Sequence, residues 1–166
     1  FPILLLHGYP QTGYMWHKVA PMLARDFTIV VADLRGYGDS DKPETDQTHS
    51  PYSKRTMAMD MREVMRQLGH KTFALVGHDR GARVAHRMAR DYPDVITRLA
   101  LLDIVPTLAM YQKTDKVFAS SYYHWFFLIQ PAPFPETLIA SDPEFFIKHK
   151  INHWGRTAGA ITDEAF

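Results

Sequence analysis

The sequence predicts an α/β fold built on a doubly wound, mainly parallel sheet. Four short apolar runs are continuous rather than alternating and are rich in Ile, Leu and Val, as expected of strands covered on both faces. Helix-like segments separate these runs, and this alternation favours parallel strands joined by right-handed crossovers. Internal repeats and low-complexity tracts are absent from the 166 residues.

The composition excludes several classes of protein. Hydrophobic residues make up 46% of the chain and charged residues 22%, which is typical of a globular domain. The formal net charge is +1, so no strong field favours nucleic acid or an anionic membrane surface. The absence of cysteine excludes disulfides, zinc-thiolate sites and thiol catalysis. The apolar runs are far shorter than a membrane span and no signal peptide is visible, so we expect a cytoplasmic enzyme.

The expected strands lie in the first two thirds of the chain. They are Ile3–His7, Phe27–Asp33, Thr72–Gly77 and Thr97–Asp103. The expected helices are Trp16–Ala24 after the first strand, Lys54–Leu68 before the third, and Ala82–Tyr92 after it. We therefore assign residues 1–103 to a partial α/β core.

From residue 104 onward the character of the sequence changes. Residues 104–166 are rich in aromatic side chains, include the proline-rich QPAPFP, and show helical patches without a further strand. We expect a partial helical lid over the C-terminal edge of the sheet, where ligands bind in open α/β folds. A small helical subdomain with an ordinary aromatic core is the alternative.

The stretch LVGHDRGARVAH contains a turn typical of a nucleophile elbow. Gly77 and Gly81 flank Asp79 between the third strand and the following helix, in the pattern small-X-nucleophile-X-small. A carboxylate needs no base to act as a nucleophile at neutral pH, and it suits displacement at a saturated carbon, which gives an alkyl ester that water then cleaves. The alternative is that Asp79 only caps the helix.

A second motif, His7-Gly8-Tyr9-Pro10, follows the first strand. Its glycine-containing loop can present the backbone N–H of Tyr9 toward the nucleophile. Together with the N–H of Arg80, the residue after the nucleophile, it would supply two donors to an oxyanion. The motif is weak alone, but its place ahead of the elbow strengthens it.

Together these motifs resemble the α/β-hydrolase superfamily, in the branch with an aspartate nucleophile that includes haloalkane dehalogenases, epoxide hydrolases and haloacetate dehalogenases. The stretches HGYPQT, VADLRGYGDSDKP, GHDRGARVAHRMA, LALLDIVPT and YHWFFLIQPAPFPE are most similar to the fluoroacetate (haloacetate) dehalogenases. The similarity runs through essentially the whole chain. Haloalkane dehalogenases and epoxide hydrolases usually have Trp after the nucleophile, where this sequence has Arg80.

The resemblance implies that Arg80 and Arg83 bind the carboxylate of the substrate. A fork of N–H donors matches a carboxylate, and a bound anion would relieve the conflict of about 0.3–1 kcal/mol between these cations and the positive end of the helix dipole. One alternative is a solvated stripe that also includes Arg87 and Arg90. Another is a pair between Asp79 and Arg83, one helical turn apart.

Further site residues follow from the resemblance. Asp103, at the end of the fourth strand, matches the acid that orients the catalytic histidine; otherwise it would cap the next turn. His124 and Trp125 match the residues that hold the departing halide, and imidazole and indole N–H groups are suitable donors. Trp154 would line the same pocket. By chemistry alone, an aromatic His-Trp pair is more often a packing feature.

The family places its catalytic histidine, and a further halide-binding tyrosine, downstream of the lid. None of the nine histidines lies on a strand-end loop after the lid, and His149 and His153 fall in helical lid segments. The chain also starts directly on an apolar strand without Met and stops within a polar, helix-like stretch. We therefore expect a fragment that lacks the first strands, the C-terminal strands and the catalytic histidine.

The expected function is hydrolytic release of halide from a 2-haloacid such as fluoroacetate, without a metal or an organic cofactor. One alternative is an epoxide hydrolase or haloalkane dehalogenase of the same fold, in which Tyr111, Tyr122 or Tyr123 could polarise an epoxide. Another is a non-catalytic relative that binds a small carboxylate. The expected partner is the small haloacid, and we expect no binding to nucleic acid or to a membrane. The full-length protein could form a homodimer.

Overall fold

A computed structural model describes residues 1–154 and residue 161 of the chain. The chain divides into two compact units, Phe1–Ile104 and Val105–Phe166. The first unit contains a sheet covered by helices, and the described part of the second unit is helical.

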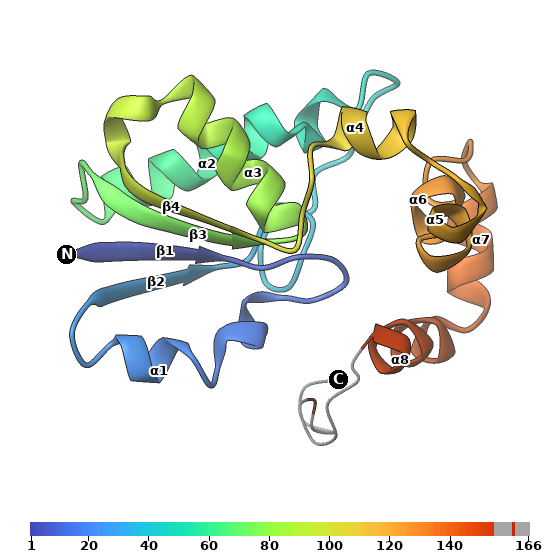
Figure 1. Ribbon diagram of the computed structural model, residues 1–166, viewed down its shortest axis with the longest axis horizontal. Coiled ribbons are helices and arrows are strands. Elements are labelled where there is room, and N and C mark those ends of the chain that lie inside the picture. Colours follow the sequence, from blue (N-terminus) through green and yellow to red (C-terminus); the bar gives the residue numbers. More distant parts are fainter. Residues whose placement is uncertain (155–160, 162–166) are drawn as a thin grey trace. The chain divides into compact units, whose positions relative to one another are not determined.

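A four-stranded sheet forms the centre of the first unit (Figure 1). Neighbouring strands are all parallel, and their order across the sheet is β2-β1-β3-β4. The strands are β1 (Pro2–Leu6), β2 (Thr28–Ala32), β3 (Phe73–His78) and β4 (Ile96–Leu102). All four predicted strands are confirmed, since each differs from its predicted bounds by a single residue at either end.

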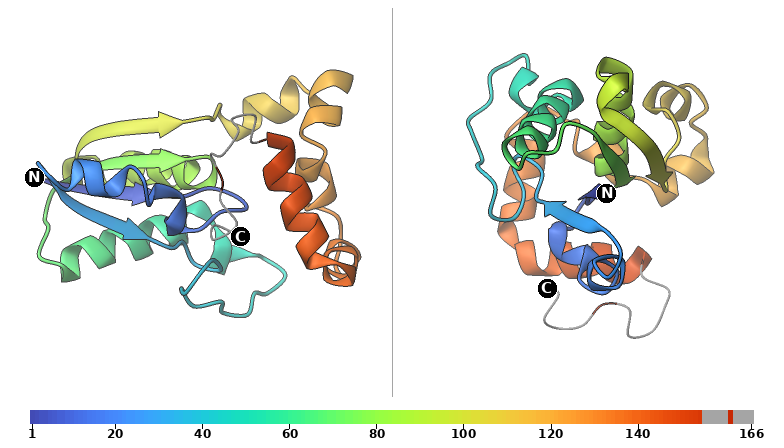
Figure 2. Two further views of the ribbon diagram at one scale, coloured as in Figure 1. Left: turned by 90° about the horizontal axis from the view of Figure 1, so that it is seen from below. Right: turned by 90° about the vertical axis from the view of Figure 1, so that its left-hand side faces the viewer.

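Helices cover both faces of this sheet. In Figures 1 and 2, α1 lies on one face, and α2 and α3 lie side by side on the other. The α-helices of this unit are α1 (Ala20–Leu23), α2 (Lys54–Gln67) and α3 (Arg80–Asp91), and its short 3-10 helices are η1 (Gly13–Trp16), η2 (Ser50–Tyr52) and η3 (Pro93–Val95). The prediction of a doubly wound parallel sheet is therefore confirmed.

The larger apolar core lies between the sheet and helices α2 and α3. Strand residues alternate between the two faces, whereas Met57, Met61 and Met65 recur every fourth residue along one stripe of α2. Full burial of such side chains stabilises the fold by about 1.5–3 kcal/mol each. The buried members of this core are Leu4, Leu6, Leu34, Met57, Ala58, Met61, Met65, Phe73, Leu75, Val84, Ala85 and Met88.

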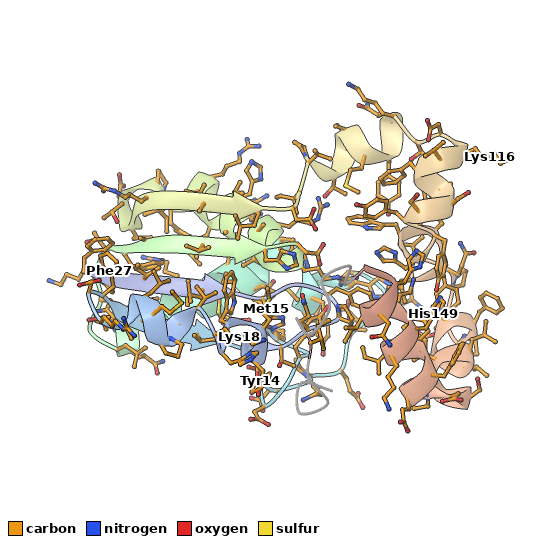
Figure 3. The ribbon with its side chains drawn as sticks, turned by 60° about the horizontal axis from the view of Figure 1, so that its bottom comes forward. Tyr14, Met15, Lys18, Phe27, Lys116 and His149 are labelled. Atoms are coloured by element: carbon orange, nitrogen blue, oxygen red, sulfur yellow. The ribbon has the colours of Figure 1, made fainter. Side chains whose placement is uncertain are left out.

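A smaller apolar core lies on the opposite face, toward η1 and α1. It consists of buried Ile3, Leu5 and Ala74 from the strands together with Trp16 of η1. Met15 and Phe27, both labelled in Figure 3, pack against it. The two cores hold β1 and β3 from both sides, so the carboxyl ends of these strands are fixed in position.

Two predicted helices have different bounds in the structure. In place of a helix over Trp16–Ala24, the chain forms η1 and then α1, which has only four residues. Pro21 explains this break, because proline is accepted in the first turn of a helix but cannot continue a preceding one. The helix predicted from Ala82 begins two residues earlier, at Arg80.

The prediction that all four strands are buried on both faces holds for β1 and β3 only. Strand β4 lies at an edge of the described sheet, where Leu99, Leu101 and Leu102 are 41%, 37% and 42% exposed. Strand β2, at the other edge, is also partly exposed.

The second unit contains five helices in its described part and no strand there, as the sequence predicts. Helix α5 begins where the Asp115 carboxylate accepts the Phe118 N–H at 2.7 Å, and α8 begins where Asp142 accepts the Phe145 N–H at 2.9 Å. The five helices are α4 (Thr107–Gln112), α5 (Lys116–Ser121), α6 (His124–Phe127), α7 (Phe134–Ser141) and α8 (Pro143–Trp154). Among the described residues, no helix has the length and apolar character needed to cross a membrane.

Candidate active site

Asp79 lies at a sharp turn between β3 and α3. Its backbone has φ 45° and ψ −112°, a conformation that costs a non-glycine residue about 1–3 kcal/mol. The Asp79 N–H donates to the carbonyl of Leu102 at the end of β4, and the Asp79 carbonyl accepts the N–H of Arg83, both at 3.1 Å. The Asp79 side chain makes no capping hydrogen bond to the described backbone of α3. Asp79 thus holds the N-cap position of α3, but capping does not account for the orientation of its carboxylate.

Gly77 and Gly81 are required by the close approach of backbone segments at this turn. A Cβ on Gly77 would lie 2.5 Å from the carbonyl oxygen of Gly81 and 2.6 Å from the amide nitrogen of Ala82. A Cβ on Gly81 would lie 2.6 Å from the carbonyl oxygen of Leu6 in β1. Backbone atoms cannot move aside as a flexible side chain can, so neither position accepts a larger residue.

The loop after β1 brings Tyr9 to the Asp79 carboxylate. The Tyr9 N–H donates to Asp79 Oδ1 at 2.7 Å, although the two residues are 70 positions apart in sequence. Gly8 permits this approach, because a Cβ at Gly8 would lie 2.6 Å from Asp79 Cβ and 3.0 Å from Oδ1. The predicted donor thus points at the predicted nucleophile.

The neutral form of His7 holds the same loop in place. The ring is fully buried, with Nδ1 2.9 Å from the Gly8 carbonyl oxygen and Nε2 3.0 Å from the Leu34 amide nitrogen. Because an amide N–H can only donate, Nε2 is the acceptor and the proton lies on Nδ1, which donates to Gly8. Burial lowers the pKa of His7, outweighing the Gly8 carbonyl and the Asp33 carboxylate, which act to raise it. His7 therefore holds the loop through backbone contacts at both of its ring nitrogens.

Lys54 interacts electrostatically with Asp79, Arg80 and Arg83 near the elbow. Arg80 and Arg83 come from the first turn of α3, and Lys54 is the first residue of α2. The pKa of Lys54 is lowered to about 8, first by burial and then by the charges of Arg80 and Arg83, while Asp79 acts to raise it. Positive charge thus exceeds negative charge among these four groups, which suits the binding of an anion.

The arginines of α3 do not form one solvated stripe. Arg83 is only 9% exposed, whereas Arg87 donates to the carboxylate of Asp91 at 2.7 Å further along the helix. The solvated-stripe interpretation is therefore wrong for Arg83.

Tyr37, on the loop after β2, is a member of this site that the sequence analysis missed. Its ring packs edge-on against His7 with the centroids 5.0 Å apart, and its side chain hydrogen-bonds to Arg80. Burial raises the pKa of Tyr37, whereas the charge of Arg80 acts to lower it. The Arg80 guanidinium also lies 5.2 Å from the ring centroid of Tyr9, so Arg80 contacts two tyrosines.

Asp103 follows β4 and lies beside the elbow. Its backbone has φ 59°, and its Oδ2 lies 3.7 Å from Nε2 of His78, the residue before Asp79. Its side chain is 74% exposed. The structure therefore brings Asp103 near the predicted nucleophile, and its role toward a catalytic histidine stays a prediction.

The remaining predicted site residues belong to the second unit. His124 is 7% exposed and lies beside the ring of Tyr123, with the centroids 6.2 Å apart. The Trp125 ring packs edge-on against Tyr111 at 5.9 Å, in the aromatic core of this unit. Their predicted contact with a halide stays a prediction. Trp154 ends α8, and its side chain lies outside the described part of the chain.

Helix α8 carries a buried cation in addition. Lys150 is 2% exposed, and its Nζ lies 3.4 Å from the ring centroid of Tyr123; burial lowers the pKa of Lys150 to about 8. His149, labelled in Figure 3, and His153 stack on the exposed side of the same helix. Within the residues that the structure describes, no group of three or more His, Asp or Glu side chains could hold a metal ion.

A parallel, doubly wound sheet that carries an aspartate at a strained strand-to-helix turn, where the carboxyl ends of the strands lie, defines a class of protein. The chain belongs to the alpha/beta hydrolase fold family, whose sequence model matches residues 2–150.

Individual proteins of this family are similar to the chain over most or part of its length. The chain is 54% identical over 155 residues to a fluoroacetate dehalogenase of Burkholderia sp. This match covers 93% of this chain and 51% of that protein. It is 46% identical over 108 residues to a soluble epoxide hydrolase of Corynebacterium sp. (strain C12), covering 65% of this chain and 36% of that protein. A solved structure of a candidate alpha/beta hydrolase from Nostoc sp PCC 7120 matches with a TM-score of 0.96 and 57% identity, over 99% of this chain and 56% of that one. The chain thus spans about half the length of the Burkholderia protein.

Proposed function

We propose that the protein carrying this chain hydrolyses the carbon–halogen bond of a 2-haloacid such as fluoroacetate, releasing glycolate and halide. One observation carries this proposal: the Asp79 carboxylate stands at a strained elbow, and Arg80 and Arg83 lie in the first turn of the helix that follows it. A carboxylate nucleophile suits a saturated carbon, and an excess of cations suits a substrate that is itself an anion. The similarity to the Burkholderia fluoroacetate dehalogenase supports the same substrate class.

The first chemical step is displacement of the halide by Asp79. The Tyr9 N–H holds Oδ1, which leaves Oδ2 to attack the carbon that bears the halogen. A new C–O bond forms as the carbon–halogen bond breaks, and the halide leaves with the electron pair. The product is an ester between the Asp79 carboxyl and the former haloacid. Arg80 and Arg83 hold the substrate carboxylate during this step, which fixes the distance and direction of attack.

The second step is hydrolysis of the ester at Cγ of Asp79. Water adds to Cγ, and negative charge develops on Oδ1, which already accepts the Tyr9 N–H. The N–H of Arg80 is the proposed second donor to this oxyanion. Glycolate leaves with Oδ2, and the oxygen from water remains in Asp79. The proposal includes a histidine, oriented by Asp103, that removes the proton from this water and then gives it to Oδ2 as glycolate leaves.

We assign the two units different roles in this reaction. The first unit is the catalytic core, and the second is the lid. His124 and Trp125 donate their ring N–H groups to the departing halide, and Trp154 lines the same pocket. The reaction as written needs no cofactor.

Substrate charge tests the proposal. Chloroacetate should be turned over and the neutral chloroacetamide should not, with halide release followed by an ion-selective electrode. Replacing Arg80 or Arg83 with Leu should weaken productive binding by about 2–5 kcal/mol, the scale for truncating one partner of a buried charge pair. Lys at either position should rescue only part of this loss, because it lacks the planar fork. Equal rates on the two substrates would overturn the proposed carboxylate clamp.

An epoxide hydrolase is the second candidate. The similarity to the Corynebacterium soluble epoxide hydrolase favours it, and Tyr111, Tyr122 and Tyr123 of the second unit could polarise an epoxide oxygen. The arginines beside Asp79 would then have no carboxylate to bind. Faster conversion of styrene oxide to its diol than of chloroacetate to glycolate would favour this candidate.

A further inference from the structure

We propose that His149 and His153 form a binding site for a divalent transition-metal ion on the exposed side of α8. This inference goes beyond the proposed function, because neither histidine takes part in the proposed reaction. The two residues are four positions apart on one helix, and side chains with this spacing are neighbours on the helix surface. Two histidines at this spacing can therefore bind one metal ion together.

The two imidazole rings lie next to each other in the structure. Their centroids are 6.0 Å apart and their planes differ by 15°. The ring of Phe145, one helical turn earlier, stacks on His149 at 5.7 Å. Both histidines are exposed, and His149 is labelled in Figure 3. Because their side chains are exposed, rotation between staggered rotamers can turn one ring nitrogen of each toward a shared ion without displacing the apolar core.

The charges beside the pair favour a cation. Asp142, Glu144 and Lys148 line the same depression in the surface as the two histidines. The Lys148 ammonium donates to the Glu144 carboxylate at 2.6 Å, so these two charges offset each other. The carboxylate of Asp142 then supplies an excess of negative charge, which attracts a metal cation to the depression.

The place of the pair along α8 adds to this preference. His153 lies in the last turn of the helix, where the helix dipole favours positive charge. Lys150, which follows His149, is 2% exposed and packs against the ring of Tyr123. Its ammonium therefore does not lie among the exposed groups around the two imidazoles.

The donor atoms select the class of metal. Imidazole nitrogens suit Cu²⁺, Ni²⁺ and Zn²⁺, whereas Mg²⁺ prefers oxygen ligands. In the described part of the chain no group of three or more potential ligand side chains forms, so water would complete the coordination of an ion held by two nitrogens. We therefore expect Cu²⁺ to bind more tightly than Ni²⁺, and Mg²⁺ not to bind.

Calorimetry with Ni²⁺ tests the site in the protein that carries this chain. His149→Gln and His153→Gln should each weaken Ni²⁺ binding by at least about tenfold, because loss of a residue that only supports a metal ligand already costs about 10–100-fold. The control His86→Gln removes an exposed histidine of α3, whose neighbours one turn away are Ala82 and Arg90, and should bind as the wild type does. Affinities of His149→Gln and His86→Gln within twofold of each other would overturn the inference.

A shifted histidine distinguishes a paired site from two independent imidazoles. The double variant Lys148→His/His149→Gln keeps the number of histidines but places two of them five positions apart, on different faces of α8. It should bind Ni²⁺ as weakly as His149→Gln, although it also removes a positive charge. Binding as tight as that of the wild type would contradict the proposed pairing.

Electron paramagnetic resonance of bound Cu²⁺ gives a readout of the ligands themselves. The wild type should show coupling to two imidazole nitrogens, and His149→Gln and His153→Gln should each show coupling to one. A single coupled imidazole in the wild type would refute the shared site.

Discussion

The orientation of the Asp79 carboxylate depends on a single backbone donor and on one missing side chain. The Tyr9 N–H holds Oδ1 at 2.7 Å, and Gly8 leaves the space into which the Asp79 side chain projects. The backbone of Asp79 is meanwhile strained and held at both its N–H and its carbonyl. These contacts preorganise one carboxylate oxygen as a future oxyanion and leave the other to react.

Gly8→Ala should remove activity while the chain still folds. Its Cβ would lie 2.6 Å from Asp79 Cβ, so the carboxylate must move away from the Tyr9 N–H. Loss of one such donor reduces kcat by about 100- to 1000-fold. The matched control is Gly69→Ala, where the Cβ meets open space but φ is +84°. The control should lose about 1–2 kcal/mol of stability and keep its activity. Wild-type halide release by Gly8→Ala would contradict the role given to this loop.

His7 should make the stability of the first unit depend on pH. Burial holds the pKa of His7 in the folded chain below its value of 6.5 in a model peptide, so the unfolded chain binds the proton more readily. The contribution of neutral His7 is complete above pH 6.5 and is lost as the pH falls below 6.5 through the folded pKa. Melting temperatures measured from pH 8 to pH 5 should therefore decrease toward acid.

The variant His7→Asn provides the comparison for this titration. It should be less stable at every pH, because the Leu34 N–H and the Gly8 carbonyl lose the partner that they share. Its melting temperature should also change less between pH 6.5 and pH 5 than that of the wild type. Parallel curves for the two proteins would show that His7 does not cause the acid sensitivity.

Among the elements, the loop after β2 is anchored by several hydrogen bonds near the site. The Asp33 carboxylate accepts the Gly13 N–H at 2.6 Å and the Asp39 N–H at 3.0 Å. Burial acts to raise the pKa of Asp33, but these hydrogen bonds outweigh it and the pKa is lowered. Arg35 then ties the loop to α2 through a bidentate contact with Asp60, at 2.7 and 2.8 Å. The loop thereby carries Tyr37 to Arg80.

Breaking the Arg35–Asp60 pair should destabilise the chain more than breaking a similar pair on the surface. Both side chains are about three-quarters buried, at 26% and 28% exposed, so Arg35→Met leaves a partly buried carboxylate without its donor. We expect a loss of about 1–3 kcal/mol in the free energy of unfolding. The control is Arg66→Met, whose bidentate partner Glu63 is on the same helix and whose side chain is 66% exposed.

The control variant should lose no more than about 0.5 kcal/mol, because exposed pairs within one helix contribute little. Urea unfolding measures both changes. Equal losses in the two variants would show that burial does not strengthen the Arg35–Asp60 contact.

The elements that the sequence predicted well are those with a local signal. The apolar runs of β1 and β3 and the glycines around Asp79 can be read within a few residues, and the structure has them where they were expected. Pro21 is a local signal as well, because it marks the break between η1 and α1.

Residues that act through tertiary contact were not readable. Tyr37 reaches Arg80 from the loop after β2, and it has no neighbour in sequence that indicates this partner.

At the scale of the whole chain, the site is assembled where the carboxyl ends of the strands meet. Strand β3 leads to Asp79, β1 leads to Tyr9, and β4 leads to Asp103. The amino ends of α2 and α3 add the cations. This edge of a parallel sheet is the usual position of a ligand in open α/β folds, so one topology supplies the nucleophile, the oxyanion donor and the carboxylate clamp of the proposal.

A covalent ester on Asp79 can be detected directly by isotope labelling. A single turnover of haloacetate in water enriched in heavy oxygen, with enzyme in excess, should place one labelled oxygen in the Asp79 carboxylate, because hydrolysis occurs at Cγ and glycolate leaves with an oxygen of the enzyme. Mass spectrometry of the peptide that contains Asp79 measures this label, and Asp79→Asn serves as the unreactive control. Label in the Asp79 peptide of the wild type is the predicted result. Label in glycolate with an unlabelled Asp79 would show that water attacks the substrate itself, and the nucleophile assignment would be wrong.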